Sequence, residues 1–176
     1  MPQVQFTFEH VSPYPLERYG QAVLEKARTA SLDHTLVPRA GEPGCYDYVR
    51  AHPVPKYLRF VFPNAAWSSM ECIRTHTEPF TLTFQNEWLG VGVSGRTTFA
   101  RGRGGAGGTT FVHTVVSFLL PEHIPVWVAT PLLRSCAQKR FSAERAVEEE
   151  VAEMSIRTDL YGAESPGEPP SMSISA

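Results

Sequence analysis

The sequence predicts an α+β domain in which a curved antiparallel β-sheet surrounds a long C-terminal α-helix and leaves an internal apolar cavity. Three patterns support this architecture. Alternating apolar and polar residues between positions 80 and 120 are typical of half-buried strands. An amphipathic helix is expected after the first strand, and a long helical pattern runs from about Pro131 to about Arg157. An antiparallel sheet can keep one face in water while the other packs on helices.

Size and charge fit one soluble domain. The chain has 176 residues, of which 42% are hydrophobic and 19% charged, and its net charge of −2 provides no positive field for nucleic acid. The most apolar run, Ile124–Leu133, contains two prolines and is far shorter than the roughly 20 residues that span a bilayer. No secretory signal is evident. We therefore expect a soluble intracellular protein, with one domain over residues 1–158 and a disordered Pro/Ser/Gly-rich tail over residues 159–176.

The N-terminal third predicts a strand, a helix and further strands. Pro15 suits the first turn of the helix. A short strand is possible at Thr35–Val37, and the next strand carries two tyrosines and Arg50 on one face. Lys56 to Phe62 fits either a short helix or a strand. The apolar positions of the first strand and of the helix are Val4, Phe6 and Phe8, then Leu16, Tyr19, Val23, Leu24 and Ala27.

The middle of the chain predicts a meander of four strands, at about residues 70–77, 80–85, 90–100 and 109–120. Three glycines in the third strand indicate bulges or strong curvature. Gly102 to Gly108 forms a flexible hairpin tip before the last strand. The long helix that follows has an apolar stripe of Leu133, Ala137, Phe141, Val147, Val151 and Met154.

A bent sheet that grips one long helix need not touch it everywhere, and the remaining gap would form an apolar ligand chamber. The alternative is that phenylalanine side chains fill the interior as an ordinary core. The sequence leaves both interpretations open. The aromatic residues concerned are Phe80, Phe84, Phe99, Phe111 and Phe118.

Motifs of catalysis and cofactor binding are weak. Gly102 to Gly107 fits the spacing G-x-G-x-x-G, but predicted strands flank it, whereas the dinucleotide fingerprint needs a helix after it. Cys45, Cys72 and Cys136 form no C-x-x-C pair, and the six histidines lack ligand spacing, so buried thiols and ordinary histidines are expected. Ser94 misses the nucleophile elbow by one position. We predict no catalytic residue, no cofactor and no metal site.

Three short motifs carry a resemblance to a known family. They are Phe8-Glu9-His10 before Pro13-Tyr14, Pro55-Lys56-Tyr57 before Phe62-Pro63, and Arg140-Phe141-Ser142 in the last helix. With the order of elements, they resemble the START-like, helix-grip superfamily and, within it, the PRELI/MSF1 family of phospholipid-transfer proteins. The resemblance implies a non-enzymatic carrier of a phospholipid or other hydrophobic small molecule. It also implies a transient membrane contact, a small helical partner protein and the mitochondrial intermembrane space.

A phospholipid carrier must neutralise a phosphate inside a partly dry chamber. The candidate ligand-binding residues are Arg50, Lys56, Arg74 and Arg145. Arg50 stands where the resemblance places a lipid-contacting lysine. Glu148, Glu149 and Glu150 depart from the often basic final helix of the family, which weakens the expectation of an anionic headgroup.

The segment before the last helix could form a lid that enters a membrane interface, or it could pack as an internal loop. Its apolar residues are Ile124, Val126, Trp127 and Val128. The rival hypothesis is an enzyme of the same fold, such as a polyketide cyclase or hydrolase. It predicts ionisable groups that converge inside the cavity, such as Glu71, Glu87 or His113, although solvent-facing positions would also explain these residues. A binding module for a hormone-like ligand is a third possibility.

Overall fold

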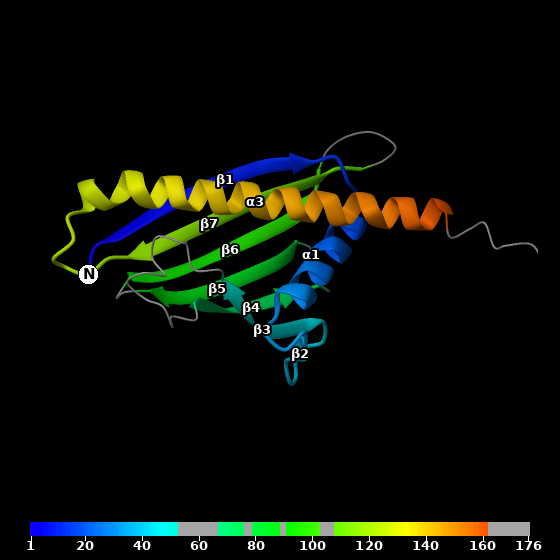
Figure 1. Ribbon diagram of the computed structural model, residues 1–176, viewed down its shortest axis with the longest axis horizontal. Helices are drawn as coiled ribbons and strands as arrows, with labels where there is room; N and C mark the ends of the chain where they lie inside the picture. Colours follow the sequence, from blue (N-terminus) through cyan, green and yellow to red (C-terminus); the bar gives the residue numbers. More distant parts are fainter. Residues whose placement is uncertain (53–66, 76–78, 89–90, 103–107, 162–176) are drawn as a thin grey trace, which may run out of the picture.

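The computed structural model describes residues 1–52, 67–75, 79–88, 91–102 and 108–161. In this part of the chain, one antiparallel sheet has the strand order β1-β7-β6-β5-β4-β3-β2 and curves beneath a long helix (Figure 1). The α+β prediction of a curved sheet around a long C-terminal helix is therefore confirmed. The strands are β1 (Gln3–Ser12), β2 (Val37–Pro38), β3 (Cys45–His52), β4 (Trp67–Arg74), β5 (Phe80–Trp88), β6 (Val91–Arg101) and β7 (Thr110–Leu119).

Strand register gives the sheet two different faces, because successive side chains of a strand alternate. The inner face, which faces the helices, carries most of the apolar core. One row of paired residues crosses this face from β1 to β3: Phe6, Val116, Gly95, Phe84, Glu71 and Tyr48. The neighbouring row lies on the outer face: Gln5, Ser117, Ser94, Gln85, Met70 and Val49.

Helix α1 (Leu16–Ala30) forms as its amphipathic pattern predicts, with Tyr19, Val23 and Ala27 fully buried. The backbone N–H of Tyr19 donates to the carbonyl of Pro15 at 2.9 Å, which closes the first turn. Lys26 is also buried on this helix, although it is charged. The helix packs against the C-terminal half of α3 (Figure 1).

Helix α3 (Val126–Tyr161) begins five residues before the predicted start at Pro131. The first turn forms before the proline, because the N–H groups of Val128 and Ala129 donate to the carbonyl of Pro125 at 3.1 and 3.2 Å. Pro131 lies near the helix start, where it removes one backbone hydrogen bond without ending the helix. The helix also continues past the predicted domain boundary at residue 158.

The predicted apolar stripe of α3 is correct only in part. Ala137 is buried and Leu133 and Phe141 are partly buried, but Val147 and Met154 are exposed. Over residues 126–155, the buried positions of this helix are Ala129, Ala137, Glu148 and Ala152. Small alanines allow close packing, and Glu148 is buried because α1 supplies partners for its carboxylate.

Other differences are small shifts at strand ends. The strand predicted at Met70–Thr77 runs from Trp67 to Arg74, and the short strand predicted at Thr35–Val37 is Val37–Pro38. β7 follows the glycine-rich stretch, as predicted, so the helix that a dinucleotide site requires is not there. The element predicted at residues 56–62 lies outside the described residues, as does the part of the predicted disordered tail at residues 162–176. Neither described helix has an apolar stretch of the length and purity that a bilayer span needs.

Candidate functional site

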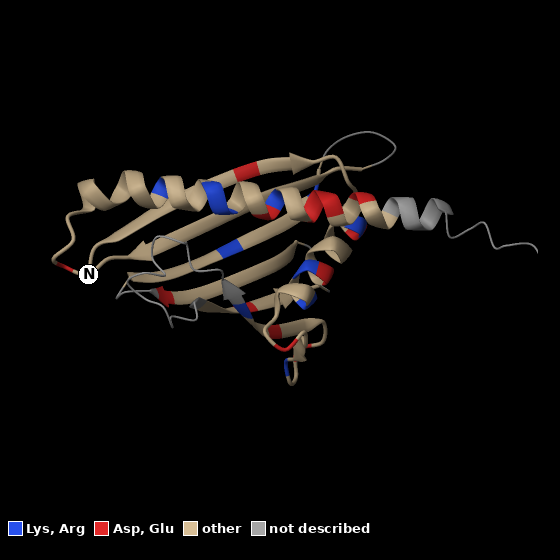
Figure 2. Cartoon of the chain, viewed as in Figure 1, with Lys and Arg blue, Asp and Glu red and all other residues tan. Residues whose placement is uncertain are grey.

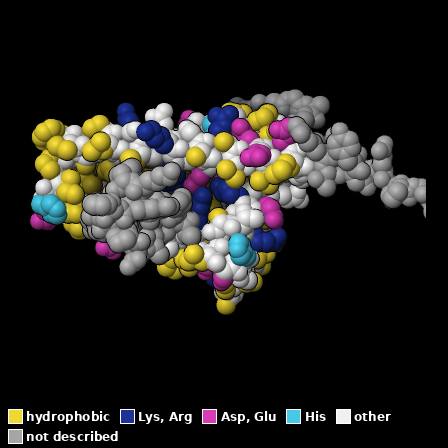
Figure 3. Space-filling model, in the orientation of Figure 1, with side chains coloured by type: hydrophobic (Ala, Val, Ile, Leu, Met, Phe, Trp, Pro, Cys, Tyr) yellow, Lys and Arg dark blue, Asp and Glu magenta, His cyan; other side chains and the backbone are white. Residues whose placement is uncertain are grey.

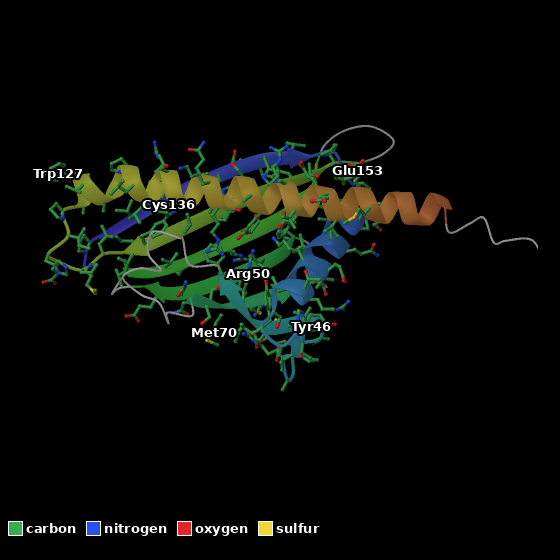
Figure 4. The ribbon with its side chains drawn as sticks, viewed as in Figure 1. Tyr46, Arg50, Met70, Trp127, Cys136 and Glu153 are labelled. Carbon is green, nitrogen blue, oxygen red and sulfur yellow. The ribbon has the colours of Figure 1, made fainter. Side chains whose placement is uncertain are left out.

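The inner face of the sheet changes from apolar to charged along the row that ends at Tyr48. Phe6, Val116 and Phe84 form the apolar part, and Glu71 and Tyr48 complete the row on β4 and β3. Helix α3 lies above this row, and Figure 3 shows charged side chains set back beneath it. Figure 4 places Arg50 in the same region, on the sheet side of α3. In Figure 2 the blue and red segments of β3, α1 and α3 gather in this part of the molecule.

Glu71 is the most buried carboxylate of this region, since its side chain is 1% exposed. It accepts hydrogen bonds from the hydroxyls of Tyr48 and, at 2.9 Å, Ser69. Arg140 of α3 lies 3.5 Å away and Arg50 of β3 lies 3.8 Å away. Burial first, and then the carboxylate of Glu71, raise the pKa of Tyr48, so this phenol stays protonated at neutral pH.

Glu144 of α3 accepts hydrogen bonds from the same two arginines. Its Oε1 lies 3.0 Å from Arg50 Nη1 and 2.9 Å from Arg140 Nε, and Lys26 Nζ lies 3.9 Å from Oε2. Burial alone would raise the pKa of Glu144, but Lys26, Arg140 and Arg50 together lower it to about 2. This carboxylate is therefore ionised at any physiological pH, and it holds α3 to β3.

The charges continue between the two helices. Lys26 donates a hydrogen bond to Glu148, and the hydroxyl of Tyr19 donates to the same carboxylate at 2.5 Å. His10 Nε2 lies 3.3 Å from that hydroxyl. Burial, followed by the charge of Arg145, lowers the pKa of His10, so the imidazole is neutral at pH 7.

We call the residues of this continuous network the charge cluster: Lys26, Tyr48, Arg50, Glu71, Arg140, Glu144 and Glu148. Its three cations balance its three carboxylates. A buried charge needs a partner, and each charge here has at least one. The cluster is therefore electrically neutral but rich in fixed hydrogen-bond donors and acceptors.

An aromatic wall adjoins the charge cluster. The guanidinium of Arg140 lies over the ring of Phe84, 5.4 Å from its centroid. Phe141 contacts Phe84 and Phe8, with ring centroids 6.3 and 5.1 Å apart. Phe8, Phe141 and Val93 are only partly buried, although they lie on surfaces that face the interior. These side chains therefore keep some contact with solvent on the inner side of the sheet.

Solvent reaches the charge cluster through a cleft between α1, β3 and α3. The cleft has a volume of about 280 Å³, and Lys26, Arg50, Glu144 and Val147 contribute to its lining. A larger hollow of about 780 Å³ lies against the outer face of β3, β4 and β5. Both hollows are open to solvent, and within the described residues neither is an enclosed apolar cavity.

The predicted basic residues separate in space. Arg50 belongs to the charge cluster. Arg74 lies on the outer face and pairs with Glu42 at 2.7 Å, whereas Arg145 lies on the exposed side of α3 and pairs with Glu149 at 2.9 Å. Lys56 lies outside the described residues. The structure therefore does not bring Arg74 or Arg145 to Arg50.

The predicted lid residues fall into two groups. Ile124 is partly buried and packs against the core. Val126, Trp127 and Val128 form the first turn of α3 and are exposed, with Trp127 80% accessible. The expectation of a loop at positions 126–128 is thus wrong. Figure 4 places Trp127 at one end of the molecule, and hydrophobic side chains cover much of that end in Figure 3.

Sequence reasoning missed most of the charge cluster. Glu71 was a candidate acid or base and does lie inside, but Glu87 is exposed and His113 lies on the outer face, 3.6 Å from Glu9. Arg140, Glu144 and Glu148 recur every four residues on α3, on the face that packs inward. That spacing was the only feature of the sequence that could have predicted a row of charged side chains on one face of the helix. Within the described residues, no group of three or more His, Cys, Asp or Glu could hold a metal.

No family model matches the chain, and no curated protein matches its sequence. Solved structures do match. TTHA0849 from Thermus thermophilus has a TM-score of 0.57 and 16% identity over 88% of this chain and 99% of that chain. The Zhui aromatase/cyclase from Streptomyces sp. R1128 has a TM-score of 0.59 and 8% identity over 90% of this chain and 98% of that chain.

A third match is the di-domain ARO/CYC StfQ from the steffimycin biosynthetic pathway, with a TM-score of 0.59 and 13% identity. The match covers 88% of this chain and 52% of that chain, so this chain spans about half the length of StfQ. No PRELI/MSF1 protein is among the structures named here. At these identities the matches establish architecture alone, and the chain has the helix-grip fold.

Proposed function

We propose that this protein binds a hydrophobic small molecule with a polar end, between the inner face of the sheet and α3. The single observation that supports this most strongly is the meeting of the aromatic wall with the charge cluster at Arg140. Its guanidinium contacts Phe84 on one side and Glu71 and Glu144 on the other. Apolar pockets with a few converging polar groups are the usual form of a small-molecule site.

The charges of the charge cluster restrict which polar groups the ligand can carry. Arg50 and Arg140 are already paired with Glu71 and Glu144, so an anion would have to displace a carboxylate from an arginine. A neutral hydroxyl or carbonyl can instead share these donors and acceptors without adding charge. We therefore propose an uncharged ligand with hydroxyl or carbonyl groups, such as a polyphenol or polyketide.

An enzyme acting on such a ligand is the second candidate function. Tyr48 and Glu71 are hydrogen bonded inside the site, which gives a protonated phenol beside a carboxylate. Such a pair can donate a proton to a ligand oxygen and accept one back. Two matched structures are named aromatase/cyclases, and their architecture supports the comparison.

The PRELI/MSF1 resemblance implies that the bound molecule is a phospholipid and that the protein transfers it between membranes. It also implies contact with a membrane surface, a helical partner protein and the mitochondrial intermembrane space. The exposed first turn of α3, which includes Trp127, supports a membrane contact. The balanced charge cluster argues against an anionic headgroup. We therefore treat phospholipid transfer as an outcome to be tested rather than as the preferred function.

The test is a fluorescence titration with 1-aminoanthracene, a neutral aromatic probe. Val93 and Ser94 are neighbours on β6 that face opposite sides of the sheet. We expect Val93→Phe to fill the inner site and weaken binding at least tenfold, whereas Ser94→Phe leaves binding to the inner site intact. Arg140→Met should also weaken binding, and Arg145→Met on the exposed side of the same helix should not.

Equal affinity in all four variants, or loss only in Ser94→Phe, would refute the inner site. Circular dichroism spectra establish that each variant is folded. Transfer of a labelled phospholipid between vesicles, abolished by Val93→Phe, would establish the carrier form instead. Cyclisation or dehydration of a poly-β-ketone, lost in Glu71→Gln while 1-aminoanthracene still binds, would establish the enzyme.

A further inference from the structure

Two cysteines lie side by side on the outer face of the sheet, away from the charge cluster. Cys45 of β3 and Cys72 of β4 are 2% and 9% exposed, and their Sγ atoms are 3.3 Å apart. The register pairs Cys45 with Arg74 and Cys72 with Asp47, so the two thiols are diagonal neighbours on adjacent strands. A disulfide requires the sulfurs to approach to about 2.05 Å. Diagonal neighbours on adjacent strands lie about 7–8 Å apart between Cα atoms, so closing the bond requires the side chains to rotate and the two strands to move together.

The larger hollow gives one of these sulfurs a route to solvent. It lies on the outer face, has a volume of about 780 Å³ and is lined by Cys72 together with Val49, Met70 and Thr83. Cys45 does not contribute to its lining. A small reagent can therefore meet Cys72 first, with Cys45 directly behind it.

We propose that Cys45 and Cys72 are a redox-active pair that a small disulfide such as oxidised glutathione converts to an intramolecular disulfide. This inference is independent of the ligand-binding function proposed above. It rests on two separate observations, the contact between the thiols and the opening of the hollow at Cys72.

The chemistry proceeds in two exchange steps. The thiolate of Cys72 attacks one sulfur of oxidised glutathione, forms a mixed disulfide and releases one glutathione thiolate. The thiolate of Cys45 then attacks Cys72 Sγ, and the bond to glutathione breaks to release the second. The two protein thiols have lost two protons and two electrons in total, and one oxidised glutathione has become two reduced molecules. Reduced glutathione in excess reverses both steps.

Charged groups surround the pair and set its rate. Asp47 lies beside Cys72, and Arg39 pairs with Asp47 at 2.7 Å. Arg74 is the cross-strand neighbour of Cys45 and pairs with Glu42 at 2.7 Å. Burial, the hydrogen bond with Cys45 and the neighbouring Asp47 raise the pKa of Cys72 to about 12. The thiolate is therefore scarce at pH 7, and we expect slow oxidation that accelerates about tenfold for each unit rise in pH.

The disulfide would join β3 and β4, the two strands that contribute residues to the charge cluster. Tyr48 and Arg50 follow Cys45 on β3, and Glu71 precedes Cys72 on β4. Because Cys45 and Cys72 point to the opposite face, oxidation fixes the spacing of these strands without occupying the inner site.

The experiment uses the full chain with Cys136→Ser, which removes the exposed third thiol. The folded protein is incubated with oxidised glutathione, quenched in acid and analysed by peptide mass spectrometry. We expect a cross-linked peptide pair containing Cys45 and Cys72, loss of two hydrogens from the intact mass, and full reversal by dithiothreitol. Adding Cys45→Ser should leave a persistent glutathione adduct on Cys72, whereas adding Cys72→Ser should leave Cys45 largely unmodified.

Wild-type protein supplies an internal reference, because Cys136 is exposed and reacts without a partner. Cys45 and Cys72 that remain free at pH 9 after prolonged incubation with excess oxidised glutathione would overturn the proposal, as would a stable adduct on Cys72 in the presence of Cys45. A rate that does not depend on the glutathione concentration would mean that the thiols react only after unfolding. That result would overturn the role of the hollow.

Discussion

Replacing Glu144 by glutamine tests the charge cluster at its centre. The substitution preserves the shape of the side chain but removes the charge that Arg50, Arg140 and Lys26 share. Glu144 has a folded-state pKa of about 2, against an ordinary value of 4.5. This difference corresponds to about 3 kcal/mol of folding stability at pH 7. Breaking a buried ion pair typically costs a similar amount, about 3–5 kcal/mol.

The pH dependence of the folding stability lost in Glu144→Gln is a stronger test than the magnitude of that loss. Because the folded state lowers the pKa of Glu144, its contribution is complete above pH 4.5 and disappears as the pH falls towards 2. The difference between wild type and Glu144→Gln should therefore shrink from about 3 kcal/mol at pH 7 to about 1 kcal/mol at pH 3. Urea denaturation at both pH values measures it.

Glu149→Gln is the matched control, since Glu149 lies on the same helix and pairs with Arg145 near the surface. Exposed pairs of this kind contribute about 0–1 kcal/mol, so the control should change stability little. The reasoning is refuted if Glu144→Gln destabilises the protein no more than Glu149→Gln. It is also refuted if its effect stays constant from pH 7 to pH 3.

Three further predictions concern single side chains. Gly95→Ala should cost about 1–3 kcal/mol in urea denaturation, because its added methyl would overlap the ring of Phe84; no loss would mean that the ring does not lie there. Tyr19→Phe should cost about 1.5–3 kcal/mol in the same assay by removing the 2.5 Å hydrogen bond to Glu148, and a neutral result would show that this bond contributes nothing. Trp127→Ala should change stability by less than about 0.5 kcal/mol, because the side chain is 80% exposed. The Trp127→Ala substitution should also reduce the fraction of protein that sediments with phosphatidylcholine vesicles, if the first turn of α3 enters the membrane interface. Equal sedimentation of variant and wild type would exclude that contact.

The sequence predicted the fold well because the fold is encoded in local patterns. Alternation of apolar residues predicted β5 and β7, and helical spacing predicted α1. Pro131 misled the prediction of the start of α3, since a proline tolerated near a helix start looks the same in sequence as one that begins the helix.

The site was less predictable because its contacts join distant residues. The shared face of Tyr48 and Arg50 followed from strand alternation and is confirmed. The partner of Arg50, however, is Glu144, 94 residues away, and that of Lys26 is Glu148, 122 residues away. Without those pairings, the sequence predicted Arg50 as a cation for a phosphate, and Glu148 was only a departure from the basic final helix of the family. Only the packing of α3 on α1 and β3 makes the charge cluster neutral.

Amide chemical-shift mapping of ¹⁵N-labelled protein with 1-aminoanthracene tests the central claim most directly, because it reports which side of the sheet the ligand occupies. We predict that saturating probe shifts the resonances of Phe84, Phe141 and Arg140, where the aromatic wall meets the charge cluster. Shifts confined to the outer-face residues Val49 and Met70, or no shifts at saturation, would contradict a ligand site between the sheet and α3.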